Sequence, residues 1–97
     1  MDWSGTPDDP HGYFKLRQFV AEAADRVASA GHPETANRLR IASEWVGMPS
    51  EWMGECALAL KGALELQDLP GDLATDLDDA LSGIRLGFQR VGQQPNF

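Results

Sequence analysis

Residues 70–91 read PGDLATDLDDALSGIRLGFQRV and have the clearest periodicity in this chain of 97 residues. Their apolar side chains recur every three or four positions and share one side of a helical wheel. They are Leu73, Leu77, Ala80, Leu81, Ile84, Phe88 and Val91. Gly83 and Gly87 interrupt this helix, where a glycine costs roughly 1 kcal/mol relative to alanine. We therefore expect close helix packing or a local bend near them.

Three earlier segments show the same period and predict amphipathic helices over about residues 10–30, 33–46 and 50–66. Gly31 is expected to end the first of them, and Pro33 suits the first turn of the second. No run of alternating β-branched residues supports a strand.

The four segments predict an all-α fold, a small four-helix bundle with short connections and antiparallel neighbours. We expect residues 10–97 to form a single helical domain. Residues 1–9 are rich in Asp, Gly and Pro and predict a flexible or surface-draped arm that Trp3 is placed to pin. The tail, residues 92–97, is expected to fray.

The whole formal net charge of −7 falls between Glu51 and Asp79, where eight carboxylates face a single base, Lys61. The seven acids and seven bases elsewhere cancel. A concentrated negative field suggests a surface for a basic protein partner. It argues against direct binding of nucleic acid or of a membrane, both of which call for clustered Lys and Arg.

The candidate partner-binding residues are the carboxylates on and just before the last helix, with those of the third helix as secondary candidates. The first group is Asp68, Asp72, Asp76 and Asp79, and the second is Glu51, Glu55 and Glu65. The alternative is a solvated helix face, which acidic residues commonly form. Like charges one turn apart repel by a few tenths of a kcal/mol, and no base lies near them in the sequence to offset this, which slightly favours a binding role.

Four apolar residues are candidates for either a core or an interface: Trp45, Trp52, Leu58 and Leu86. Core packing, or crowding near the loop at Gly47, is the expectation for both tryptophans. Cys56 is flanked by Ala57 and Leu58 and is expected to be a small core residue.

No residue pattern predicts catalysis, a metal site or a cofactor. Glu51 and Glu55 could act as an acid/base pair only with a further chemical group beside them, and capping of a helix start explains Glu51 without function. His11 and His32 do not lie at metal-ligand spacing to Cys56. A lone cysteine, no signal-like N-terminus and no apolar run long enough for a bilayer predict a cytoplasmic protein.

Residues 54–65, GECALALKGALE, are followed by LPGDL at 69–73 and by the helix that runs to Phe88. This order of a Gly-Glu, an Ala-Leu-rich helix, a loop and a last amphipathic helix resembles small bacterial immunity proteins encoded beside secreted polymorphic toxins. The resemblance implies a non-enzymatic, cytoplasmic inhibitor that neutralises a cognate toxin, frequently a basic nuclease. Two other functions stay open: a phage-encoded DNA mimic that disables a defence enzyme, and a helical self-association module. The oligomeric state is also open.

Overall fold

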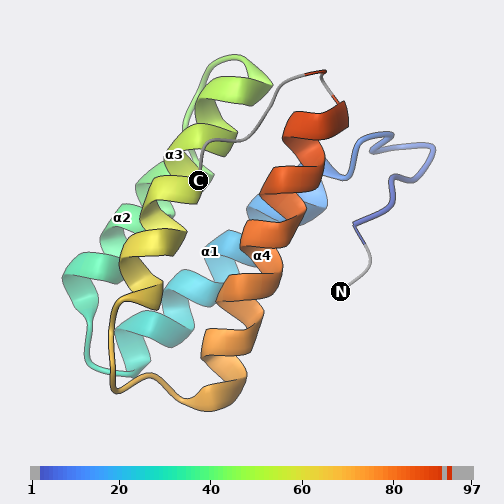
Figure 1. Ribbon diagram of the computed structural model, residues 1–97. Helices are drawn as coiled ribbons and strands as arrows, with labels where there is room; N and C mark the ends of the chain where they lie inside the picture. Colours follow the sequence, from blue (N-terminus) through green and yellow to red (C-terminus); the bar gives the residue numbers. More distant parts are fainter. Residues whose placement is uncertain (1–2, 91, 93–97) are drawn as a thin grey trace.

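The computed structural model describes residues 3–90 and 92, and in that part of the chain it contains four α-helices and no strand. They are α1 (Tyr13–Ser29), α2 (Pro33–Ser43), α3 (Pro49–Leu64) and α4 (Gly71–Arg90). Consecutive helices run antiparallel through short connections (Figure 1). Within the described chain α1 packs on α2 and α4, α3 packs on the same two helices, and α2 does not touch α4. The predicted all-α four-helix bundle is confirmed.

Helix α1 begins at Tyr13, three residues after its expected start at residue 10. Gly12 occupies the N-cap position with a left-handed backbone, at a φ of 69°, and has no side chain that could cap the helix. The carboxylate of Asp9 replaces the cap, because its oxygens accept the backbone N–H groups of Phe14 at 3.3 Å and of Lys15 at 3.1 Å. The chain before the helix is thus tied to the first turn of α1.

The connection from α1 to α2 follows the sequence expectation. Gly31 has a φ of 97°, and its N–H donates to the carbonyl of Ala28 while that of His32 donates to Val27. This pair of bonds is the Schellman motif, which favours glycine at the left-handed position. Pro33 then occupies the first turn of α2.

Helices α2 and α3 end earlier than expected, at Ser43 rather than Val46 and at Leu64 rather than Leu66. The guanidinium of Arg17, from α1, donates to the carbonyl oxygens of Ser43 at 3.3 Å and Trp45 at 2.9 Å. A cation at a helix C-terminus satisfies carbonyls that would otherwise need a further helical turn. At the end of α3 the N–H groups of residues 65 and 66 donate to carbonyls three positions back, which tightens and ends the helix.

The core lies between the four helices, where the apolar stripe of α4 is buried as its periodicity predicts. The buried side chains of the four helices include both large residues and alanines. The largest wholly buried ones are Trp52, Leu39, Met53, Leu60, Leu77 and Ile84. The alanines Ala23, Ala24, Ala36, Ala57, Ala63 and Ala80 are buried among them. Val91 lies outside the described residues.

Two glycines of α4 receive large side chains, as expected from their place in the helix. A Cβ on Gly83 would lie 2.8–3.0 Å from three atoms of the Trp3 indole, and one on Gly87 would collide with the sulfur of Met53. Trp3 is 8% exposed, and its Nε1–H donates to the backbone carbonyl of Asp79 at 3.1 Å. Phe19 meets the same indole edge-on, with ring centroids 5.2 Å apart.

Trp3 thus pins the N-terminal segment beside α4, as predicted (Figure 1). The division into an arm over residues 1–9 and a domain over residues 10–97 stays a prediction. The expected fraying of residues 92–97 concerns a segment that, apart from Gly92, lies outside the described residues.

We predict that Gly83→Ala lowers the free energy of unfolding by about 1 to 2 kcal/mol, because overpacking against the indole exceeds the helix propensity that alanine gains. Gly62→Ala in α3 is the matched control. A Cβ there meets nothing within 4 Å, so this variant should be stabilised by about 0.5 to 1 kcal/mol. Urea unfolding of both variants measures the difference.

The cost at Gly83 should disappear when the indole is absent, so Gly83→Ala is also made in a Trp3→Ala background. Equal stabilisation by Gly83→Ala and Gly62→Ala in the parent chain would contradict the close contact between Trp3 and α4.

Candidate functional site

The predicted acidic residues are divided between two parts of the surface. Glu65 and Asp68 are exposed in the segment that connects α3 to α4, and Asp72 is exposed in the first turn of α4. Asp76 and Asp79 follow on the same helix and are half-buried. Asp78, which was not among the candidates, is exposed beside them. We call these six carboxylates the acidic face.

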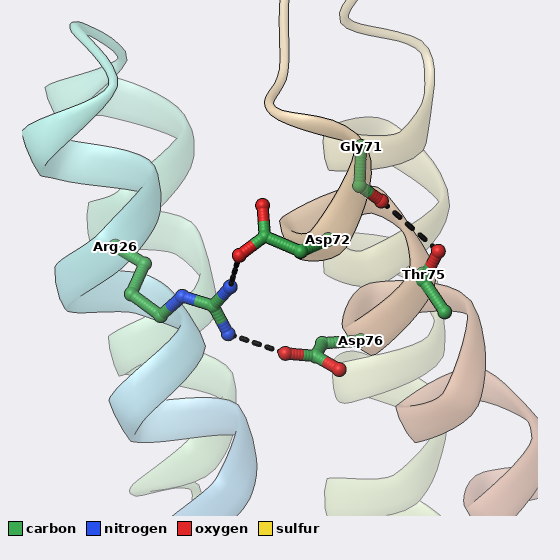
Figure 2. A network of polar contacts seen from close by, with 5 residues as sticks. All are labelled: Arg26, Gly71, Asp72, Thr75 and Asp76. Carbon is green, nitrogen blue, oxygen red and sulfur yellow. Dashed lines mark hydrogen bonds and ion pairs between the residues drawn. The ribbon is translucent and has the colours of Figure 1, made fainter.

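A base from another helix reaches the acidic face, contrary to the expectation that nothing nearby offsets its charge. The guanidinium of Arg26 in α1 donates to Asp76 Oδ2 at 2.5 Å and to Asp72 Oδ2 at 3.1 Å. Figure 2 shows it held between the two carboxylates, across the gap from α1 to α4. The two aspartates lie one helical turn apart, so one planar guanidinium reaches both.

These contacts raise the pKa of Arg26, chiefly through the hydrogen bond that it donates to Asp76 and then through the negative charges of Asp76 and Asp72. Arg26 therefore stays charged throughout the physiological range. Asp72 remains 79% exposed and Asp76 37% exposed, so each retains acceptor capacity towards solvent.

A second contact holds the other end of the acidic face. His32 Nε2, at the start of α2, lies 2.9 Å from Asp68 Oδ1, where an Nε2–H donates to the carboxylate. This joins the α1–α2 connection to the α3–α4 connection. The two residues are 36 positions apart, and no local sequence pattern predicts their pairing.

The acidic face remains strongly negative despite these partners. The six carboxylates and the guanidinium of Arg26 sum to five negative charges, and Arg85 and Arg90, further along α4, reduce the balance around that helix to three. Beside the ion pair a hollow of about 360 Å3 opens between the end of α1 and the start of α4, lined partly by Asp25, Arg26, Asp72 and Leu73. The surface thus combines fixed negative charge with a recess.

Glu51 and Glu55 do not join the acidic face. Glu51 lies near the start of α3, 14 positions before Glu65, which corresponds to about 21 Å along a helix. No side chain makes a cap hydrogen bond at the start of α3, and the carboxylate of Glu51 instead lies against Gly47. Glu51 is nevertheless the acidic residue in the first turn of α3, where its charge is favourable to the helix dipole, so its place at the helix start agrees with the expectation.

The four apolar candidates are separated by the fold. Trp52 is buried and lies under the guanidinium of Arg17, 4.4 Å from ring centroid to Cζ, and Leu86 packs against the core. Trp45 and Leu58 are exposed. Sequence analysis missed further exposed apolar side chains, namely Phe14, Ile41, Val46 and Met48. Ile41 fell off the apolar stripe of its helix, which was the signal available in the sequence.

Cys56 is wholly buried, as expected. Its burial, helped by the negative charge of Glu55 and opposed by Arg17, raises the pKa of the thiol to about 12. The thiol is therefore protonated and a poor nucleophile at neutral pH. Among the described residues there is no group of three or more His, Cys, Asp or Glu side chains that could hold a metal ion.

No described helix combines the length and the apolar character that crossing a bilayer requires. Comparisons with protein-family models, with curated proteins and with solved structures found no significant match to this chain.

The buried thiol makes the stability of the protein depend on alkaline pH. Because the folded pKa lies above the unfolded value, the contribution of Cys56 is complete below about pH 9 and is lost as the pH rises towards 12. We expect the free energy of unfolding to fall by about 1.4 kcal/mol between about pH 8 and pH 10 from this group alone.

Urea unfolding of the parent chain and of Cys56→Ala at both pH values isolates this effect, because all other titrating groups are shared. The variant should be about 1 to 3 kcal/mol less stable near neutral pH, through the cavity it leaves. An identical alkaline loss in both proteins would show that the thiol is not desolvated in the folded state.

Proposed function

We propose that this chain is a non-enzymatic inhibitor of the immunity type, which binds and neutralises a cognate toxin in the cytoplasm through the acidic face. The observation that supports the proposal is the set of six carboxylates around α4, which keeps three net negative charges after Arg26, Arg85 and Arg90 are counted. The partner that fits is a basic protein, and a nuclease is the leading candidate.

Charge complementarity is the physical basis of the proposal. A nuclease holds phosphate in a positive cleft, so a surface of fixed carboxylates competes for that cleft and attracts it over a distance. Arg26 pairs with Asp72 and Asp76, and His32 contacts Asp68, so these three carboxylates are held in place within the protein. A carboxylate that is already held loses less conformational freedom when it pairs with a partner's Arg or Lys.

The hollow beside Asp72 adds shape to this charge. Its wall contains the carboxylates of Asp25 and Asp72 and the apolar side chain of Leu73. A long basic side chain can bury its stem against such an apolar wall and place its charged end near the carboxylates. We therefore expect the centre of the interface to lie over the α1–α4 pair.

The proposal is tested with the products of the genes adjacent to the one that encodes this chain. One of them should inhibit growth when expressed alone and be neutralised when this protein is coexpressed. We expect the combined variant Asp72→Asn, Asp76→Asn and Asp79→Asn to slow association with that partner by about tenfold or more at low salt, and to flatten the salt dependence of the rate.

The same variant should be less stable by about 0.5 to 1.5 kcal/mol, because it loses both carboxylates that pair with Arg26 in a half-exposed setting. If repulsion between the aspartates were the only effect, removing their charges would instead make the protein more stable. Glu65→Gln combined with Asp78→Asn leaves the Arg26 pairs intact and separates lost charge from lost stability.

The matched control is Asp8→Asn, Glu22→Gln and Glu44→Gln, which changes the net charge equally at exposed positions outside the acidic face. This control variant should associate with the partner at nearly the same rate as the parent chain. An equal effect of both triple variants, or the absence of any binding partner among the neighbouring gene products, would refute the proposed role of the acidic face.

A further inference from the structure

An apolar groove lies between α2 and α3, on the side of the molecule away from α4. It has a volume of about 230 Å3 and is lined by Arg38, Ile41, Ala42, Glu55, Leu58 and Ala59. Ile41 is 52% exposed and Leu58 66% exposed, whereas Ala42 is buried and forms the floor. The groove therefore presents two large aliphatic side chains to solvent over a floor of small ones.

Arg38 and Glu55, both among the described residues, border this groove and carry opposite charges, but they do not form an ion pair with each other. Arg38 and Glu55 make no ion pair or hydrogen bond within the part of the chain that the structure describes. By contrast, the arginines Arg17, Arg26 and Arg40 all have partners. An unpaired cation and an unpaired anion beside exposed apolar side chains are the composition of an interface with its polar rim.

The order of the four side chains along the two helices is self-complementary. Helices α2 and α3 are antiparallel and connected at residues 44–48, so Ile41 is nearer that connection than Arg38, and Glu55 is nearer than Leu58. The two apolar residues thus occupy one diagonal of the groove and the two charged residues the other. A two-fold axis along the apolar diagonal sets each aliphatic side chain against its own copy and each Arg38 opposite the Glu55 of the other molecule.

We propose that this groove is the interface of a homodimer, in which a second copy of this chain pairs its Glu55 with Arg38 and buries Ile41 and Leu58. This assigns Glu55, one of the secondary partner-binding candidates, to self-association. The interface is distinct from the acidic face, because none of the residues that line the groove belongs to the six carboxylates of that face.

The distribution of charge permits this arrangement in spite of the net charge of −7. Helix α2 has two arginines and one glutamate, for a local balance of +1, while the acidic face lies around α4. Figure 1 shows α2 and α3 together on one side of the bundle and α4 on the other. A dimer formed through the groove keeps the two acidic faces apart and leaves both open to solvent.

Sedimentation of the full chain at about 1 µM to 1 mM tests the proposal, since this range covers the affinities of a small interface. We expect a concentration-dependent dimer. Leu58→Ser and Ile41→Ser should each raise its Kd by about tenfold or more, because each change removes a contact from both copies. Val46→Ser and Met48→Ser are the controls: these side chains are exposed and lie outside the groove.

Charge substitutions separate the proposed pairs from general repulsion. Arg38→Glu and Glu55→Arg should each weaken the dimer about tenfold, and the double swap should restore Kd to within about threefold. General repulsion predicts instead that Glu55→Arg strengthens association, since it lowers the net negative charge. Thermal melts at low concentration verify that each variant is folded.

A chain that stays monomeric up to about 1 mM would overturn the proposal, and so would a dimer that is indifferent to Ile41 and Leu58. A dimer that Glu55→Arg strengthens would also overturn it. These outcomes are distinct from failure of the proposed inhibitor function, because none of the substitutions alters the acidic face.

Discussion

The rest of the structure depends on how closely other segments approach α4. Gly83 and Gly87 offer no side chain, so the indole of Trp3 and the thioether of Met53 lie directly against the helix backbone. Buried alanines on all four helices add small side chains to the same core. A domain of this size has few large side chains to bury, and close approach increases the dispersion energy from each of them.

The helices could be predicted from the sequence because their signal is local. A period of 3.6 residues, a glycine after α1 and a proline at the start of α2 act within a few positions of one another. The ends that were misplaced depend on distant groups. Asp9 moves the start of α1 to Tyr13, and Arg17 donates hydrogen bonds to the carbonyls at the end of α2, 26 to 28 positions away.

The candidate site was predictable in composition and not in arrangement. Counting charges found the carboxylates around α4, but the pairing of Asp72 and Asp76 with Arg26 needs α1 and α4 to be neighbours. The same holds for the groove. Ile41 and Leu58 lie off the apolar stripes of two different helices, and only the packing of α2 on α3 brings them side by side. Isolated exposed aliphatic residues carry little information until the fold groups them.

The contact between Trp3 and α4 also orders events during synthesis of the chain. Trp3 precedes Gly83 by 80 positions (83 minus 3), and a ribosome that adds about 5 to 20 residues per second needs about 4 to 16 s to cover that distance. The helical hairpin of α1 and α2 has local contacts and can form within a small fraction of that time. Throughout the interval the indole lacks its contacts with Gly83 and with the carbonyl of Asp79. The nascent polypeptide therefore exposes a large aromatic side chain to chaperones until its last helix has been made.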